Sequence, residues 1–240
     1  MACASSGSAT RVPGANSVDL PLIRLVVVDS TQAFLRRNLH LGVCAVLADR
    51  QTEGRGRQGH PWESAAGAGL WLSVALPAPS GVAPGIVLQR AMAAAAQVLD
   101  PARQTLGLKW PNDLVAWQNG RLVKVGGIIG EQSAGRLILG LGVNLSKAPH
   151  LPDRPIPPAS LKELGLGSPP SGELAALISK IWMNLEQDIQ PLFRWPPAGT
   201  PLRWEDGQGT SLGWEPDGRL KVTTAEGIRR LSAGDISGLG

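Results

Sequence analysis

Hydrophobic and polar positions along the chain fall into short blocks, and these blocks predict more strands than helices. Apolar runs of strand length recur between glycine, proline, asparagine and aspartate residues, which favour turns. Asn119-Gly120 and Ser133-Ala134-Gly135 separate neighbouring runs and indicate hairpins. Strands are therefore predicted over residues 22–28, 43–48, 70–76, 105–110, 114–117, 122–131 and 136–143.

Helical periodicity is confined to three stretches. The alanine-rich stretch 83–99 ends at Asp100-Pro101, and apolar side chains recur at helical spacing over 173–190. A short helix over 32–39 follows Asp29-Ser30-Thr31, whose side chains suit a helix N-cap. Because strands outnumber helices and several hairpins are adjacent, the pattern favours an α+β layer rather than a doubly wound parallel sheet.

The C-terminal part of the chain has a different pattern. Short apolar runs there alternate with glycine turns, which predicts four or five antiparallel strands in a small barrel. At the other end, residues 1–17 are rich in serine, alanine and glycine. The predicted organisation is a disordered tail over 1–18, a main domain over 19–195 and a barrel over 196–240.

Composition limits the class of protein. Hydrophobic residues make up 43% and charged residues 18%, so a core is possible and wholesale disorder is excluded. The net charge is +4, with 17 arginines against 6 lysines. The planar guanidinium suits carboxylates and phosphates, which favours an anionic substrate, although a compositional bias of the coding sequence explains the same ratio.

Cysteine content and hydropathy bear on the compartment. The two cysteines, Cys3 and Cys44, support neither a disulfide framework nor a zinc site, which indicates a reducing compartment. No apolar run approaches the roughly 20 residues that span a bilayer, and the N-terminus lacks the apolar centre of a signal peptide. A soluble, cytoplasmic protein is predicted.

The segment 49–69 carries the first candidate chemistry. It contains Gly54-Arg55-Gly56-Arg57-Gln58-Gly59, which matches G-x-G-x-x-G. A dinucleotide-binding fingerprint requires a strand directly before it and a helix directly after, and His60-Pro61-Trp62 cannot open a helix cleanly. Alternating glycine and arginine instead offers main-chain amides and two guanidiniums to an anion. A solvated loop, or an Arg-Gly contact with nucleic acid, remains an alternative.

Three further motifs place polar groups at strand ends or beside glycines. Lys109-Trp110-Pro111-Asn112-Asp113 is a turn with polar side chains, and by itself it is better explained as a structural turn with a buried tryptophan. A lysine in Lys124-Val125-Gly126-Gly127-Ile128-Ile129 is costly to bury without an anion, but an edge-strand lysine on the surface explains it too. The last motif, Gly140-Leu141-Gly142-Val143-Asn144, combines close approach with an amide.

Taken in order, these motifs resemble those of the biotin protein ligases. The resemblance is good over about residues 22–145 and weaker through the barrel, where Gly234-Asp235-Ile236-Ser237 is similar to the family's closing strand. It implies an α+β catalytic domain like that of the class II synthetases, with a mixed sheet flanked by helices, followed by a small SH3-like barrel. It also implies two reactions: biotin and Mg-ATP give biotinyl-5′-AMP and pyrophosphate, and the biotinyl group then passes to a lysine of the biotin carboxyl carrier protein of acetyl-CoA carboxylase.

The resemblance also assigns roles to residues, motif by motif. Catalytic roles fall to Lys124, Arg57, Arg55 and Asp113. Biotin contacts fall to Ser30, Thr31, Gln51, Gly54, Arg55, Lys124 and Gly127. ATP or adenylate contacts fall to Arg57, Trp62, Lys109, Asn112 and Asn144, with Trp62 covering the adenine and magnesium held through substrate phosphates. The segment 49–69 is expected to order only when ligand binds.

The chain departs from the family pattern at three positions. Gln32 stands where asparagine is common, Glu53 where a small residue is usual, and His60 where another basic residue is often found. These changes put the closure of the loop in doubt more than the reaction. A lipoate ligase of the same fold, or an inactive module that binds biotin or nucleotide, are the alternative functions.

The sequence leaves little place for other partners. Only about twenty residues precede the first predicted strand, so a DNA-binding role through a winged helix is not expected. A membrane partner is not expected either. A homodimer is compatible with the sequence.

Overall fold

The computed structural model describes residues 20–151, 154–167, 170–183 and 193–238. The predicted disordered tail over 1–18, Cys3, and the end of the helix predicted over 173–190 lie outside the described residues. Within the described ranges, none of the helices combines the length and hydrophobicity needed to cross a bilayer.

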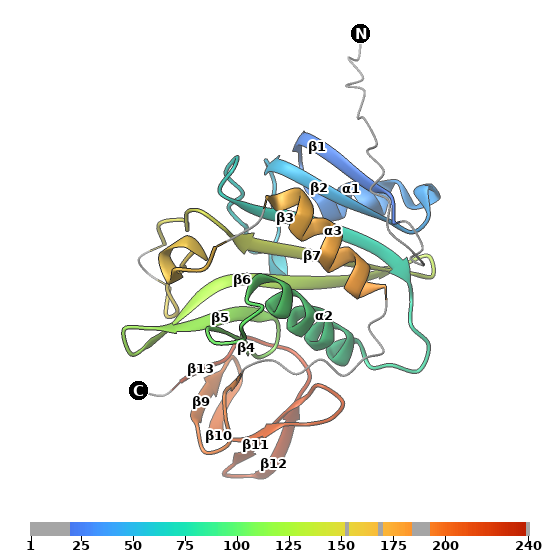
Figure 1. The fold of residues 1–240 in the computed structure, drawn as a ribbon. Helices are drawn as coiled ribbons and strands as arrows, with labels where there is room; N and C mark the ends of the chain where they lie inside the picture. The colour runs from blue at the N-terminus through green and yellow to red at the C-terminus, as the bar shows by residue number, and fades with distance from the viewer. Residues whose placement is uncertain (1–19, 152–153, 168–169, 184–192, 239–240) are drawn as a thin grey trace.

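The larger sheet is mixed, as predicted, and follows the order β1-β2-β3-β7-β6-β5-β4-β8 (Figure 1). Its strands are β1 (Leu22–Val28), β2 (Cys44–Gln51), β3 (Gly69–Pro77), β4 (Leu106–Lys109), β5 (Asp113–Gln118), β6 (Arg121–Ser133), β7 (Arg136–Asn144) and β8 (Arg194–Trp195). The β1–β2 and β4–β8 pairs are parallel and the other pairs antiparallel. All seven strands predicted for this part of the chain are present. The two-residue strand β8 was not predicted, because so short a segment has no periodicity.

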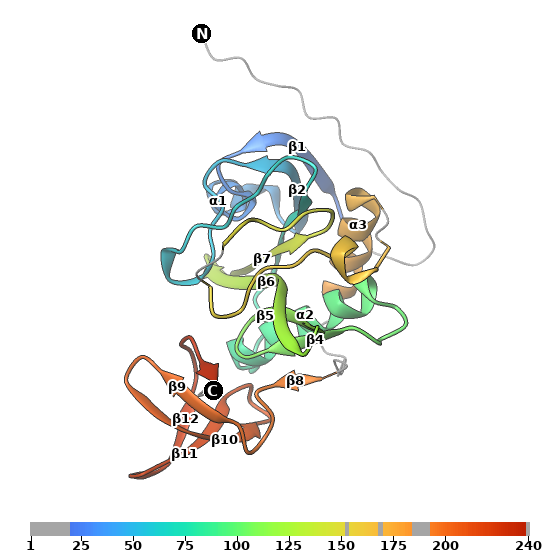
Figure 2. The ribbon, with the colours of Figure 1, turned by 90° about the vertical axis from the view of Figure 1, so that its left-hand side faces the viewer.

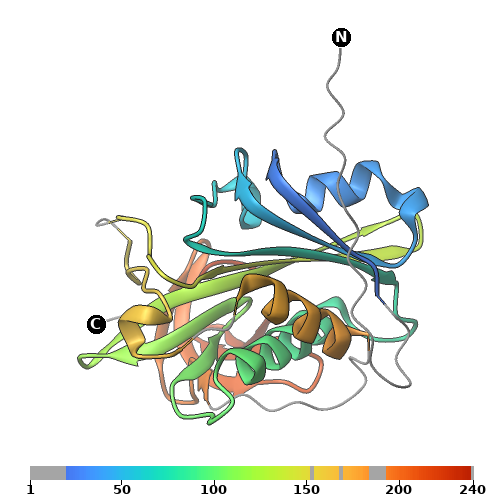
Figure 3. The ribbon, with the colours of Figure 1, turned by 45° about the horizontal axis from the view of Figure 1, so that its top comes forward.

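Helices cover the two faces of this sheet unequally. Helices α2 (Pro84–Leu99) and α3 (Ser171–Trp182) pack together on one face, and α1 (Thr31–Arg37) lies on the other (Figure 3). Short 3-10 turns follow at Leu39–Leu41, Arg57–Gly59 and Lys162–Leu164. Alternation along β7 fixes this arrangement, because Leu139 and Leu141 join the core under α2 and α3 while Ile138 joins the cluster under α1.

The smaller sheet follows in the chain and lies at one end of the larger one (Figure 2). It is antiparallel, in the order β12-β11-β10-β9-β13, with β9 (Pro201–Trp204), β10 (Gly207–Trp214), β11 (Leu220–Thr224), β12 (Gly227–Leu231) and β13 (Ser237–Gly238). Its apolar cluster includes Leu202, Leu220 and Val222, and it also takes in Trp110, which precedes β5 in the larger domain. The indole Nε1 of Trp110 donates to the main-chain oxygen of Gly218 at 3.1 Å. One tryptophan thus belongs to the core of the second sheet while its chain belongs to the first.

Candidate active site

A cavity of about 920 Å³ opens on the face of the large sheet that α2 and α3 leave uncovered. Strands β5, β6 and β7 supply its floor. The loop after β2 and the segment around Pro155 supply two of its walls, and the second sheet supplies another through residues such as Trp204 and Asp235. Every site residue predicted from the sequence lines this cavity, except Gly54, which packs directly behind it.

The floor is formed by glycines on adjacent strands. Gly140 and Gly142 occupy successive positions on the face of β7 that lines the cavity, and Gly142 pairs with Gly127 of β6. Where these positions carried larger side chains, the sheet would fill the cavity itself. The indole of Trp62 lies on Gly142, since a Cβ there would come within 2.6 Å of Trp62 Nε1. That indole nitrogen is buried without a hydrogen-bond partner.

One end of the cavity is polar but uncharged. Gln51, the last residue of β2, accepts from the main-chain N–H of Thr31 at 2.8 Å and from its hydroxyl at 3.1 Å. The Thr31 hydroxyl also shares a hydrogen bond with Ser73 of β3 at 2.8 Å. The amide of Gln51 donates to Ser64 at 2.9 Å. The strand end, the start of α1 and the returning loop are therefore held in one network.

Ser30 begins α1 rather than pointing freely into the cavity. Its hydroxyl accepts from the N–H of Ala33, and its side chain is buried. The preceding residue, Asp29, accepts two hydrogen bonds from Arg37, the last residue of α1, at 2.6 and 2.8 Å. This Arg37 contact lowers the pKa of the Asp29 carboxyl. Hydrogen bonds from α1 thus hold both Asp29 and Ser30 in place.

Gly54 is required by close packing. A Cβ at Gly54 would lie 2.8 Å from the Ser64 hydroxyl and press on the main-chain oxygen of Trp62. Gly54→Ala should therefore shift the loop and lower the free energy of unfolding by about 1–3 kcal/mol, the usual cost of overpacking. Urea denaturation measures this. Gly56→Ala is the matched control, because a Cβ there meets its nearest neighbour at 3.4 Å; equal losses in the two variants would contradict the packing argument.

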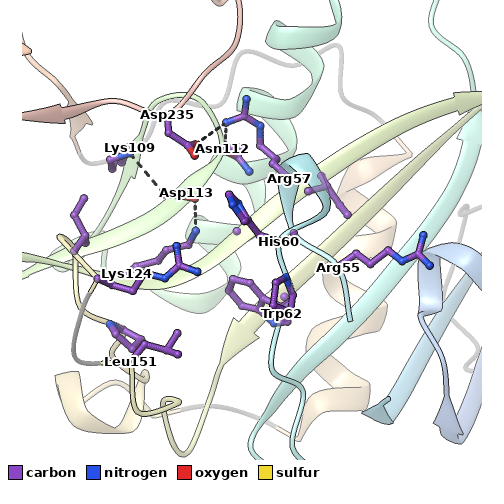
Figure 4. A pocket seen from close by; sticks show the side chains of 18 of the residues that line it. Arg55, Arg57, His60, Trp62, Lys109, Asn112, Asp113, Lys124, Leu151 and Asp235 are labelled. Carbon is purple, nitrogen blue, oxygen red and sulfur yellow. Dashed lines mark hydrogen bonds and ion pairs between the residues drawn. The ribbon is translucent and has the colours of Figure 1, made fainter. Parts of the chain in front are cut away.

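The opposite end of the cavity is charged. Lys124 of β6 and Lys109 of β4 both face Asp113, at 2.6 Å and 3.7 Å between nitrogen and carboxylate oxygen (Figure 4). Lys109 is nearly enclosed, with a side chain 7% exposed, whereas Lys124 is 31% exposed. Two cations around one carboxylate leave a net positive charge. An anionic ligand that approaches Lys124 therefore meets an attractive field.

Burial lowers the pKa of the Lys109 ammonium, and the neighbouring Asp113 carboxylate opposes this effect. Because the unfolded chain then binds this proton more tightly than the folded protein, stability gains from Lys109 as the pH rises toward the ordinary lysine value of about 10.4. As the pH rises from about 7 to about 10, the free energy of unfolding of wild type should therefore increase relative to that of Lys109→Met. Urea denaturation across this range is the measurement. A wild-type profile parallel to that of Lys109→Met would refute the prediction.

The two arginines of the glycine-rich loop point to different places. Arg57 reaches Asn112 and the second sheet, where its Nη1 is 3.3 Å from Asn112 Oδ1 and 3.4 Å from Asp235 Oδ1. Arg55 turns away from the lysines and lies 3.8 Å from Glu53. The Arg55–Glu53 pair is exposed, so it stabilises the loop little. Glu53 is one of the departures from the family pattern. Its carboxylate pairs with Arg55 away from the end of the cavity that holds Lys109, Asp113 and Lys124.

The two asparagines predicted for nucleotide contact hold the site together. The Asn112 amide donates to the main-chain oxygen of Ile128 at 2.8 Å, and that of Asn144 donates to Ala159 at 3.1 Å. Neither contact tests their predicted role toward a nucleotide. Among the described residues, no group of three histidine, cysteine, aspartate or glutamate side chains is arranged to hold a metal ion.

Sequence reasoning missed three polar members of the site. Ser73 is wholly buried within β3, and a single serine inside the apolar run 70–76 was a usable signal. Ser64 had no signal, because it lies in an irregular loop. Asp235 lies in a segment that the resemblance covered, but only the structure brings it to Arg57.

The segment 49–69 has more regular structure than predicted. Strand β2 continues to Gln51, Arg55 forms a β-bridge with Pro61, and a 3-10 turn spans Arg57–Gly59. The N–H of Trp62 donates to the oxygen of Gly54 at 2.8 Å, which closes the loop at its base. Whether ligand orders the segment remains a prediction.

Comparison with known proteins places the site in a family. The profile of the Biotin/lipoate A/B protein ligase family matches residues 26–147. A biotin–[acetyl-CoA-carboxylase] ligase of Mycobacterium tuberculosis is 31% identical over 215 residues, which is 80% of this chain and 77% of that protein. The bifunctional ligase/repressor BirA of Bacillus subtilis is 30% identical over 220 residues. The match covers 80% of this chain and spans 65% of the length of that relative.

Solved structures agree with the sequence matches. The biotin protein ligase of Aquifex aeolicus in complex with biotin and ATP is 28% identical, with a TM-score of 0.71, and the match covers 90% of this chain and 97% of that one. The ligase of Leishmania major in complex with biotinyl-5-AMP, 24% identical with a TM-score of 0.56 over 88% of this chain and 98% of that one, shares the fold. The motifs, the mixed sheet with its glycine floor and these matches together show that the chain belongs to the Biotin/lipoate A/B protein ligase family.

Proposed function

We propose that the protein is a biotin protein ligase. It would join biotin to AMP at the expense of ATP and then transfer the biotinyl group to a lysine of the biotin carboxyl carrier protein of acetyl-CoA carboxylase. The observation that carries this proposal is Lys124, whose ammonium faces Asp113 at the charged end of the cavity and whose stem lies beside Gly127 of the glycine floor. The uncharged polar end lies at the opposite end of the same cavity. Such a cavity suits a ligand with a neutral polar head and a carboxylate tail that must meet a phosphate.

The polar end is suited to a cyclic urea. Its donors and acceptors, Ser30, Thr31 and Gln51, come from two strand ends whose hydrogen bonds fix them in place. The ligand's apolar chain would cross the floor at Gly127, where an added Cβ meets nothing closer than 3.5 Å. Trp62, which now lies on Gly142, supplies a flat apolar surface and an unpaired N–H beside that path.

In the first reaction, a carboxylate oxygen of biotin attacks the α-phosphorus of ATP, and the bond from that phosphorus to the pyrophosphate oxygen breaks. Two anions must approach each other before this bond forms. Lys124 would exchange part of its contact with Asp113 for the incoming carboxylate and α-phosphate, and Arg57 would stabilise the phosphate side. Lys109, Asn112 and Asn144 would complete the nucleotide side, and Arg55 would cover the site if it leaves Glu53.

In the second reaction, the carrier's amine nitrogen attacks the acyl carbon of the adenylate, and the bond from that carbon to the phosphate oxygen breaks. The carrier's ammonium must first give a proton to water, and the nitrogen gives a second proton to water as the amide forms. Asp113 is the carboxylate nearest to Lys124, so it is the candidate to orient that ammonium. AMP leaves as the anion, in the field of the same cations.

Magnesium, which the family resemblance implies, would enter with the nucleotide. Asp113 is the carboxylate at the charged end, and its two oxygens face Lys124 and Lys109. These residues do not form a magnesium site by themselves.

A carrier mass shift tests the proposal. Purified protein with biotin, Mg-ATP and a carrier domain should add one biotinyl group to the carrier, measured by intact-mass spectrometry. A parallel reaction with lipoate is essential, because the family profile covers ligases of both cofactors. Modification by lipoate but not by biotin would overturn the proposal, and modification by neither would favour an inactive binding module.

A further inference from the structure

Arg57 and its partner on the second sheet, Asp235, differ in how much of each side chain is exposed to solvent. The Nη1 of Arg57 donates to Asn112 Oδ1 and to the main-chain oxygen of Gly234, both at 3.3 Å, and lies 3.4 Å from Asp235 Oδ1. Arg57 is 22% exposed, whereas Asp235 is 68% exposed. A mostly covered guanidinium in the wall of the cavity is thus held by a carboxylate that solvent reaches freely (Figure 4).

All three contacts use the same nitrogen. Among the described residues, none accepts a hydrogen bond from Nη2 or Nε of Arg57. A guanidinium binds a phosphate best through two parallel N–H groups on different nitrogens. At least one of these nitrogens must be Nη2 or Nε, which the protein does not use. The protein therefore binds the guanidinium through Nη1 and leaves the edge formed by Nη2 and Nε for a ligand.

We propose that Asp235 is a positioning residue for the adenylate. It would hold Arg57 by one nitrogen so that the free edge of the guanidinium faces the phosphate. The second sheet would then take part in retaining the activated intermediate, and would be more than a neighbour of the first. This inference rests on the proposed function, because it names the phosphate of that reaction as the anion.

The geometry favours positioning over competition. A carboxylate that competed with phosphate would occupy the edge of the guanidinium, and Asp235 does not. Asp235 comes from the connection between β12 and β13, and its neighbours Ile236, Ser237 and Gly238 line the same cavity. The connection therefore reaches the site as a continuous wall.

The test compares the rate at which biotinyl-5′-AMP dissociates from the enzyme, followed by stopped-flow fluorescence. Asp235→Ala should raise this rate up to about fivefold, the range of an exposed ion pair, and Asp235→Glu should restore it. Biotin affinity in the absence of nucleotide should not change, because Thr31 and Gln51 lie outside this contact. Asp206→Asn is the matched control: this carboxylate is also 68% exposed, pairs with Arg229 in the same sheet and does not line the cavity.

A double-mutant cycle shows whether the effect passes through Arg57. In an Arg57→Ala background, Asp235→Ala should change the dissociation rate less than twofold. An effect no larger than that of Asp206→Asn, or an equal effect in the Arg57→Ala background, would overturn the proposal. Failure of wild type to form any adenylate would instead overturn the proposed function. Calorimetry with a non-hydrolysable ATP analogue would then compare wild type with Asp235→Ala, where equal affinities would reject the positioning role.

Discussion

Lys124→Met is expected to slow biotinyl-adenylate formation by about a hundredfold to a thousandfold, the loss that follows removal of one preorganised donor from an active site. The methionine keeps an unbranched apolar stem but removes the charge that faces Asp113 at 2.6 Å. Incorporation of radiolabelled pyrophosphate into ATP measures the first reaction without the carrier. The loss should fall on the catalytic constant more than on the apparent affinity for biotin, whose polar head binds at the other end.

Two controls separate a chemical effect from a structural one. Lys162→Met changes an exposed lysine outside the cavity and should leave exchange at the wild-type rate. Unfolding in urea should give similar midpoints for wild type and Lys124→Met, because Lys124 is partly exposed. Exchange within a factor of about three of wild type would show that Lys124 does not stabilise the transition state.

The largest effect on stability is expected from Trp110→Ala, at about 3–5 kcal/mol. Trp110 is fully buried in the cluster of the second sheet, and its indole N–H donates to Gly218. Its removal leaves a cavity at the junction of the two sheets, and the Gly218 oxygen loses one of its two donors and keeps only Gln89 at 2.7 Å. The free energy of unfolding, followed by circular dichroism in urea, is the measurement.

Trp117→Ala is the matched control, because this tryptophan is 54% exposed on β5. It should cost less than about 1 kcal/mol. If both variants lost the same amount of stability, Trp110 would not be the anchor of the second sheet. A Trp110 variant with normal adenylation would also show that the sheets need not be docked for the chemistry.

Local pattern predicted most elements of the fold, but not the two-residue strand β8. The seven apolar runs became strands because each is bounded by turn residues, and Asn119-Gly120 closes the β5–β6 hairpin as predicted. The order of strands was beyond local pattern, since β3 pairs with β7 across more than fifty residues of intervening chain. The family resemblance supplied the mixed sheet, and the structure confirmed it.

The candidate site could also be predicted only in part from the sequence. Lys109, Asp113 and Lys124 were selected from two motifs, and the antiparallel β4–β5–β6 pairing brings them together. Side-chain direction could not be predicted: Arg55 and Arg57 are two residues apart, yet one meets Glu53 and the other meets Asp235. Those partners depend on the path of the loop and on the docking of the second sheet, and neither is encoded locally.

The glycine floor has a consequence for how such a pocket evolves. At Gly127 the protein leaves room that its own atoms do not need, since an added methyl group would make only ordinary contacts of 3.5 Å and beyond. A change to alanine there would leave folding intact while narrowing the space for a cargo. Substitutions that add one methyl group at a time can therefore change which acyl group the pocket accepts while every variant stays folded. Related ligases with different acyl substrates can then be separated by only a few substitutions.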